Sequence, residues 1–166
     1  MGVPDTFIQW VKRRVADLMS EFSISSERHA FAIWAIGYIH DLNDDDAFNQ
    51  CDTLSQGDGG VDGWNFNEAE QLFSLNQVKY PDDSSSTIGP EPVNELFRGL
   101  ELVSNPQAAA ERSEKLAQIS TEFMLARENG ASIVLNCIVF ANLSESTKRE
   151  FINRCNNNTH NPVGEI

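Results

Sequence analysis

Three polar residues lie where buried strands would ordinarily carry apolar ones. The strand expected at 72–80 has an apolar inward face that ends in Gln77 and Lys79. The acid Asp62 stands about fifteen residues before Gln77, in another strand-like stretch. Polar groups on an apolar face cost free energy unless they are paired or used. An acid, an amide and an ammonium that converge on a partly dry pocket therefore indicate a binding or catalytic site with ionic chemistry.

A β-hairpin would bring these residues together. Residues 61–67 and 72–80 have the alternation and composition of two strands, with a turn near 67–69. Asp62 opens one strand and Lys79 closes the other, so antiparallel pairing places them at the same end of the sheet. Three glycines near Asp62 leave room for a ligand or another backbone: Gly59, Gly60 and Gly63.

A purely structural interpretation stays open at this point. Asp62 and Lys79 could form a salt bridge, with Gln77 as a neighbour whose hydrogen bonds are satisfied. The apolar surroundings of all three residues count against this, because an ion pair costs less free energy on the solvated face.

Hydrophobic periodicity predicts the elements that must position these residues. Residues 5–22 have helical spacing, and a second helix, capped by Ser25 or Ser26, should reach about 42, where the polar run 43–46 ends it. The remaining elements expected are, in chain order, a short strand at 51–54, the hairpin, a loop at 81–90, a helix at 93–103 broken at 105–106, a helix at 116–126 stopped at 129–130, a strand buried on both faces at 133–140 and a helix at 145–155. This order predicts an α/β sandwich with a mixed central sheet flanked by helices.

Composition limits the function classes. The 166 residues carry a net charge of −13, which argues against nonspecific binding of nucleic acid through a broad basic surface. No apolar run approaches the ~20 residues of a membrane span, and charged residues interrupt the N-terminus where a signal peptide would be apolar. Three cysteines without a CxxC pair favour a reducing, cytoplasmic setting, and three scattered histidines argue against a zinc site.

The pattern around Asp62 resembles a known nuclease signature. Asp62 followed by Gln77-Val78-Lys79 is similar to the D…QxK form of the PD-(D/E)XK nuclease superfamily, as in Mrr-like restriction endonucleases. The segments DGGVDG (58–63) and QVKY (77–80) also resemble the nuclease domain of AIPR (abortive phage infection) proteins. The resemblance covers roughly 25–155. It implies a restriction-endonuclease-like fold and Mg²⁺-dependent phosphodiester hydrolysis, with Mn²⁺ expected to substitute.

The resemblance also implies roles for individual residues. Asp62 would be the main ligand of Mg²⁺, which prefers oxygen. Gln77 would give a neutral oxygen or orient a water, and the backbone carbonyl of Val78 would add another ligand. Lys79 would hold the attacking water and offset charge on the phosphate. Glu27 matches a helix acid of many relatives and would supply a second carboxylate, although a favourable charge at a helix N-terminus explains it equally well.

Two other acidic features carry less weight. Asp58 could share the metal if its strand starts early, but an acid beside two glycines is more often a turn residue. Calcium loops of EF-hand type fail on spacing. A loop from Asp58 has Ala69 where Glu is needed, and one from Asp41 has Asp46 where Gly is needed.

These inferences predict a metal-dependent endonuclease domain of a phage-defence protein. We expect an N-terminal helix at 1–24 packed on the core, a nuclease-like domain at 25–155 and a linker-like tail at 156–166. The expected partners are nucleic acid, with DNA favoured over RNA, and a C-terminal domain of a longer chain. A homo-oligomer is left open, and no membrane is expected. The dispersed basic residues place duplex binding by this domain alone in question. The alternative is a catalytically inactive binding or assembly domain of the same fold.

Overall fold

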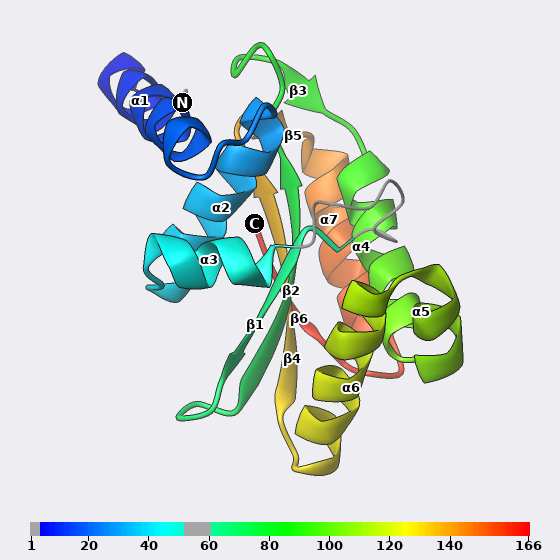
Figure 1. The fold of residues 1–166 in the computed structure, drawn as a ribbon. Helices are drawn as coiled ribbons and strands as arrows, with labels where there is room; N and C mark the ends of the chain where they lie inside the picture. The colour runs from blue at the N-terminus through cyan, green and yellow to red at the C-terminus, as the bar shows by residue number, and fades with distance from the viewer. Residues whose placement is uncertain (1–3, 52–60) are drawn as a thin grey trace.

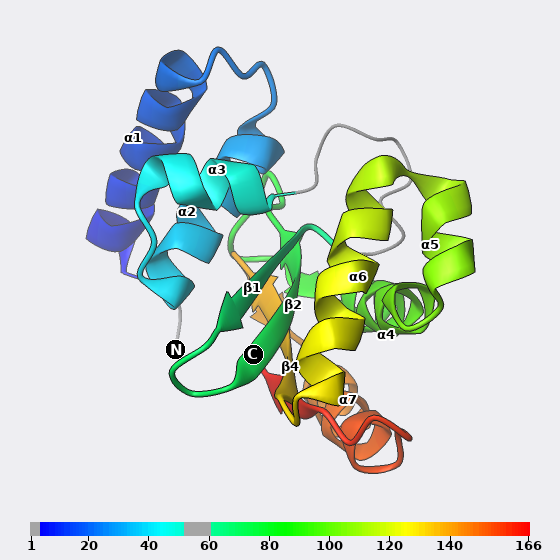
Figure 2. The ribbon, with the colours of Figure 1, turned by 60° about the horizontal axis from the view of Figure 1, so that its bottom comes forward.

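A mixed sheet with helices on both faces forms the framework of the protein (Figures 1 and 2). The structure, a computed structural model, describes residues 4–51 and 61–166. Within these ranges the elements are α1 (Asp5–Glu21), α2 (Glu27–His40), α3 (Asp44–Gln50), β1 (Gly63–Asn67), β2 (Leu72–Lys79), β3 (Thr87–Ile88), α4 (Glu91–Val103), α5 (Pro106–Arg112), α6 (Glu114–Glu128), β4 (Ser132–Val139), β5 (Asn142–Leu143), α7 (Glu145–Asn156) and β6 (Val163–Glu165). The predicted α/β class and mixed sheet are confirmed.

The main sheet has the order β1-β2-β4-β6. β1 and β2 form the predicted antiparallel hairpin, in which Gly63 pairs with Asn76 and Asn67 pairs with Leu72. β4, the strand predicted at 133–140, lies parallel to β2 over the whole length of both. A parallel pair needs a crossover connection, and here β3 and the helices α4, α5 and α6 supply it.

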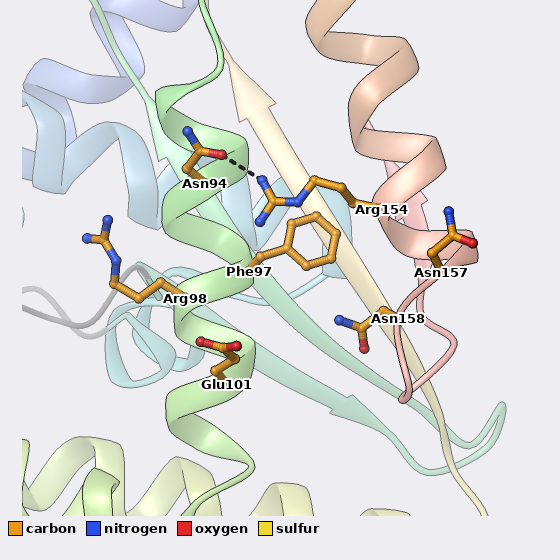
Figure 3. Close-up of a pocket in the computed structure, with 7 residues that line it drawn as sticks. All are labelled: Asn94, Phe97, Arg98, Glu101, Arg154, Asn157 and Asn158. Carbon is orange, nitrogen blue, oxygen red and sulfur yellow. Dashed lines mark hydrogen bonds between the residues drawn. The ribbon is translucent and has the colours of Figure 1, made fainter.

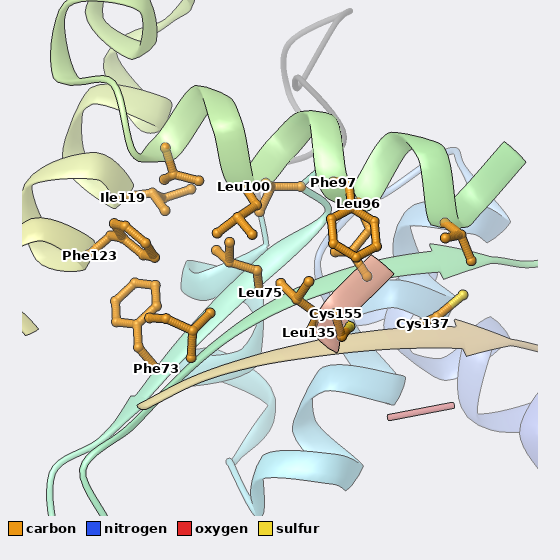
Figure 4. Close-up of a cluster of buried hydrophobic side chains, with 14 of the residues drawn as sticks. Phe73, Leu75, Leu96, Phe97, Leu100, Ile119, Phe123, Leu135, Cys137 and Cys155 are labelled. Carbon is orange, nitrogen blue, oxygen red and sulfur yellow. The ribbon is translucent and has the colours of Figure 1, made fainter. Parts of the chain in front are cut away.

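The alternation of β2 and β4 divides the core between the two faces of the sheet. Figure 4 shows Phe73, Leu75 and Leu135 facing the apolar side chains of α4 and α6. Residues of opposite parity, such as Val78, face α1, α2 and α3. Adjacent residues of one strand therefore serve different faces, which matters for a strand that carries the motif Gln77-Val78-Lys79.

Helix ends account for several differences from the predicted elements. Ser26 caps α2, where its side chain accepts from the N–H of His29, in line with one of the two predicted caps. α2 ends at His40, and the polar run at 43–46, which was predicted to end it, begins a further helix, α3. Asn43 caps α3 by accepting from the N–H of Asp46 at 2.8 Å. Asn105 likewise caps the short helix α5, so the predicted break is a change of direction.

Two short strands lie in segments predicted as irregular. Residues 87–88, inside the predicted loop, pair with β5. Residues 163–165, inside the predicted tail, form β6 and extend the main sheet beside β4. Gly164 permits this approach, since an added Cβ would lie only 2.9 Å from Cys155 Sγ on α7. A three-residue strand has too few positions for alternation to predict it.

Two further predictions concern a short strand at 51–54 and the absence of a membrane span. Cys51 makes an isolated antiparallel bridge with Gly63, while residues 52–54 of the strand predicted there lie outside the described residues. In the part of the chain that the structure describes, no helix is long and apolar enough to cross a membrane.

Candidate functional site

Asp62 is held at the entrance to the hairpin by backbone groups of β2. It is 5% exposed, and its N–H donates to the carbonyl of Asn76 at 2.8 Å. Its Oδ2 accepts from the N–H of Val78 at 2.8 Å. Since Gly63 pairs with Asn76, Asp62 lies beside Gln77 along the hairpin. A buried carboxylate is thus fixed against the strand that carries the rest of the motif.

Val78 contributes its side chain to the core and its backbone to the candidate site. Its side chain is fully buried in the cluster under α2, whereas its backbone N–H binds Asp62. In an antiparallel pair the N–H and C=O of one residue leave the same edge of the strand. The carbonyl of Val78 is therefore directed to the edge where Asp62 lies, as a backbone ligand would require.

Gln77 binds a carboxylate that the sequence did not single out. Its Nε2 donates to Oε2 of Glu95, on α4, at 2.6 Å. Because a carboxylate only accepts, this bond fixes the orientation of the amide and leaves Oε1 as its acceptor atom. Gln77 Oε1 is buried and has no hydrogen-bond partner among the described residues. A buried amide oxygen without a partner is an anomaly that a bound cation or water would resolve.

Lys79 reaches the same carboxylate from the next inward position of β2. Its Nζ lies 3.5 Å from Oε2 of Glu95 and 3.5 Å from Oε1 of Glu91, one turn earlier on α4. The Lys79 side chain is 19% exposed and that of Glu95 is 25% exposed, whereas Glu91 is largely in solvent. The pair with Glu95 is thus the better shielded of the two. Gln77, Lys79 and Glu95 form one connected polar group on the α4 face.

Glu27 lies on the opposite face of the sheet. It is exposed in the first turn of α2 and lines a small surface pocket with Tyr80. The pKa of Tyr80 is raised, first by burial and then by the negative charge of Glu27. Tyr80 and Lys79 are neighbours in sequence and so face opposite ways, and α2 covers the face of Tyr80. The structure does not bring Glu27 against Gln77 and Lys79, and its place fits the favourable charge of an acid at a helix N-terminus.

A buried thiol borders the polar group. Cys137 pairs with Gln77 in the register of β2 and β4 and is 1% exposed. Burial raises its pKa to about 11, while the positive charge of Lys79 acts in the opposite direction. A thiol that stays protonated at neutral pH is a poor nucleophile and a poor metal ligand. We assign Cys137 a packing role.

Amides on the other face hold the hairpin in register. Asn76 is fully buried; its Nδ2 donates to the carbonyl of Gly63 at 3.2 Å. Its Oδ1 accepts from Nδ2 of Asn136 at 2.8 Å and contacts Nε2 of His40 at 3.2 Å. These hydrogen bonds join β1, β2, β4 and α2 at Asn76, whose carbonyl accepts from the N–H of Asp62. It positions the candidate site without belonging to it.

Of the three glycines near Asp62 that were predicted to leave room for a ligand or another backbone, the structure describes Gly63. At Gly63 an added Cβ would overlap Cδ1 of Ile36 and lie 3.2 Å from the carbonyl of Gln50, so the space is taken by α2 and a neighbouring backbone. Gly59, Gly60 and the candidate Asp58 lie outside the described residues.

The polar group and the neighbouring pair Asp62 and Val78 together offer oxygen atoms that suit a hard cation. Asp62 and Glu95 offer carboxylates, Gln77 offers its unpartnered Oε1 and Val78 a carbonyl, which are the ligand types that Mg²⁺ prefers. Among the described residues no three His, Cys, Asp or Glu side chains cluster as a metal site would. A site of two carboxylates, an amide and a carbonyl would have only two such side chains, so it is compatible with that finding.

Glu95 lies after the hairpin, whereas the second carboxylate was predicted before it, at Glu27. Helical spacing is the signal in the sequence that points to Glu95: Glu91 and Glu95 are four residues apart on one side of α4, and Glu95 borders the apolar stripe that packs on β2. A carboxylate at the edge of this stripe can reach polar side chains of β2, as Glu95 reaches Gln77 and Lys79.

Comparisons with known proteins add no identification. No protein-family model matches the chain, and neither a curated protein nor a solved structure is significantly similar to it. The assignment of function therefore depends on the geometry of the candidate site.

Proposed function

We propose that this protein is a Mg²⁺-dependent nuclease domain of the PD-(D/E)XK type, with a restriction-endonuclease-like fold. The observation that supports the proposal most is the joint placement of the D…QxK residues. Asp62 is bound to the backbone of Val78, while Gln77 and Lys79 share one carboxylate, Glu95. The resemblance to AIPR proteins extends the proposal to phage defence in the cytoplasm, with DNA favoured over RNA and a further domain in the same chain.

The ligand set of the proposal differs from the one that the sequence predicted. Asp62 remains the main anionic ligand, with Gln77 Oε1 and the Val78 carbonyl beside it. Glu95 replaces Glu27 as the second carboxylate, because Glu95 already binds both Gln77 and Lys79. When bound, Mg²⁺ supplies Lewis-acid polarisation of a phosphoryl oxygen and neutralises negative charge.

The protein's own groups would orient the reaction. Lys79 carries a positive charge on the α4 face, where it can hold the attacking water and stabilise the charge that develops on the phosphate. Glu95 fixes the ammonium of Lys79 and the amide of Gln77 in one geometry, so that little reorganisation is needed when substrate binds. The apolar surroundings of the group, with Leu75 and Cys137 buried, lower the local dielectric and strengthen these interactions.

The decisive experiment measures cleavage and metal binding separately. Wild type should hydrolyse a mixture of single- and double-stranded DNA and RNA only when Mg²⁺ or Mn²⁺ is present. Lys79→Ala should abolish cleavage and keep metal binding in isothermal titration, since Lys79 is no ligand. Asp62→Ala should abolish both. Glu95→Gln should weaken metal binding, with Glu27→Gln as the matched control that leaves it unchanged.

The outcome also separates the alternative. If wild type binds no divalent ion and cuts no substrate, also as part of its full-length parent, the group is a structural ion-pair network and the protein is a binding or assembly domain. Equal cleavage by wild type and Lys79→Ala would refute the catalytic assignment of Lys79.

A further inference from the structure

A polar groove lies between α4 and α7 and is lined by residues other than those of the candidate nuclease site (Figure 3). Its volume is about 390 Å³. The side chains that line it come from both helices and the turn after α7: Asn94, Phe97, Arg98, Glu101, Arg154, Asn157 and Asn158. Among the described residues, the lining comprises two arginines, three asparagines, one phenylalanine and one carboxylate. This composition is unusual for a chain with a net charge of −13.

Arg154 is fixed in the groove before any ligand arrives. Its Nη1 donates to Oδ1 of Asn94 at 2.6 Å, and its guanidinium lies 4.2 Å from the centre of the Phe97 ring (Figure 3). Contact with an aromatic face and a hydrogen bond to an amide both orient a guanidinium without neutralising it. The guanidinium of Arg154 therefore stays positively charged, and its other N–H groups can donate to a ligand.

Neither arginine of the groove makes an ion pair with an acid in the described part of the chain. The ion pairs of the described residues involve the cations Arg14, Lys79 and Lys148, and none involves Arg98 or Arg154. Arg98 is exposed on α4, four residues after Asn94 and three before Glu101. The positive charges of both guanidinium groups therefore stay available to an anion.

From these observations we propose that the groove binds a phosphate group. Arginine matches the oxygens of phosphate with parallel N–H donors. The guanidinium of Arg154 already lies between α4 and α7, whereas the exposed side chain of Arg98 extends to the other side of α4 and would have to turn toward the groove to reach the same group (Figure 3). Asn158 adds an amide donor after α7, because its Oδ1 accepts from the N–H of His160 and this bond orients the amide; the amide of Asn157 already donates to Asn153. Of the described lining residues, Glu101 alone carries a negative charge that opposes an anion, so its replacement should strengthen binding.

The phosphate could belong to a polynucleotide or be free in solution. Arg98 and Glu95 are three residues apart on α4, so their Cβ atoms are about 5–6 Å apart. A strand bound across the outer side of α4 could therefore reach both the candidate site and the groove. The inference goes beyond the proposed function, because the groove could hold phosphate even if the chain cuts nothing.

Binding without cleavage gives the test. A fluorescent single-stranded oligonucleotide is titrated with protein in EDTA by anisotropy, and inorganic phosphate is titrated separately by calorimetry. Arg98→Gln and Arg154→Gln should each weaken oligonucleotide binding about tenfold. Each should also reduce the slope of log affinity against log salt by about one. Glu101→Gln should tighten binding.

The matched control is Arg149→Gln, which removes the same charge from α7 at a position that does not line the groove. It should change neither affinity nor salt slope. Arg98→Gln keeps the test valid if loss of Arg154 impairs folding, because Arg98 makes no ion pair with the described residues. Arginine-dependent binding of inorganic phosphate alone would identify free phosphate as the ligand.

The proposal is overturned if wild type binds neither probe, or if the arginine variants and Arg149→Gln bind alike. Cleavage measured with Mg²⁺ on the same variants keeps the two proposals apart. A wild type that binds but does not cut fails only the nuclease assignment.

Discussion

Replacement of Gln77 by glutamate tests the polar group at its centre. In the wild type, Gln77 donates to Glu95 at 2.6 Å, so Gln77→Glu removes the donor and sets two carboxylates against each other. From sequence alone this substitution would preserve or tighten Mg²⁺ binding, because a glutamate stands at this position in most of the family that it resembles. The structure adds a cost in the absence of metal.

The size of that cost follows from burial and distance. Gln77 is 1% exposed and the Glu95 side chain 25% exposed. A hydrogen bond to a charged group is worth about 1.5–3 kcal/mol, and two like charges about 3 Å apart repel by about 5 kcal/mol at an effective dielectric of about 20. Proton sharing between the carboxylates limits the repulsion. We expect the free energy of unfolding to fall by about 2–4 kcal/mol in EDTA at pH 8.

Urea denaturation with and without Mg²⁺ measures both effects. Mg²⁺ should restore more stability to Gln77→Glu than to wild type, because binding to the folded state alone stabilises by mass action and the variant has one more anionic ligand. The double variant Gln77→Glu/Glu95→Gln reverses the donor and acceptor. It should recover most of the loss without metal, which gives a favourable coupling in the double-mutant cycle.

Two results would refute this reasoning. A Gln77→Glu variant as stable as wild type in EDTA would mean that the bond to Glu95 contributes nothing. A variant that is destabilised but gains no more from Mg²⁺ than wild type would place Gln77 outside any metal site.

Three further predictions concern the surroundings of the site. Gly63→Ala should lower the free energy of unfolding in urea by about 1–3 kcal/mol, because its Cβ would overlap Ile36 in a packed core; an unchanged midpoint would contradict this. Cys137, with a pKa of about 11, should react with iodoacetamide at pH 8 more than about 100-fold slower in the native protein than after unfolding, and equal rates would contradict its burial. Burial lowers the pKa of His40, so the unfolded chain binds more protons and stability should fall as pH drops below about 6.5. His40→Gln should flatten that fall between pH 7 and 5.5, and an unchanged pH profile would count against it.

The sequence predicted the hairpin and its partner strand because their signals are local and strong. Alternation over 61–67 and 72–80, with a turn between, leaves one register that buries the apolar residues of both strands. The run at 133–140, apolar except for Asn136, has the composition of a strand covered on both faces, and β4 is such a strand. Most residues of these strands share one preference, so the strands can be predicted from the sequence alone.

Other features depend on contacts that no local pattern encodes. β6 has three residues and is a strand only because β4 offers an open edge beside it. Glu95 belongs to the candidate site because α4 crosses β2 at the height of Gln77, which is a property of helix packing. The same packing separates Glu27 from the motif, since α2 lies on the face of Val78 and Tyr80. Motif spacing identified residues on the strand and could not choose between helices on its two sides.

The crossover between β2 and β4 has a consequence for the order of folding. The contact of Asp62 with Val78 closes a loop of sixteen residues, and that of Gln77 with Glu95 closes one of eighteen, whereas Asn76 and Asn136 are sixty residues apart. Hairpins form in about 1–10 μs, while pairing across a long crossover pays a larger entropy of loop closure and is slower. The hairpin can thus gather Asp62, Gln77 and Lys79 early, in a chain that still has one face of β2 open to solvent. Glu95 can join them stably only when α4 packs against both β2 and β4. A nascent chain would hold an incomplete polar group until β4 has been synthesised, so the completed group should appear with the slowest folding phase.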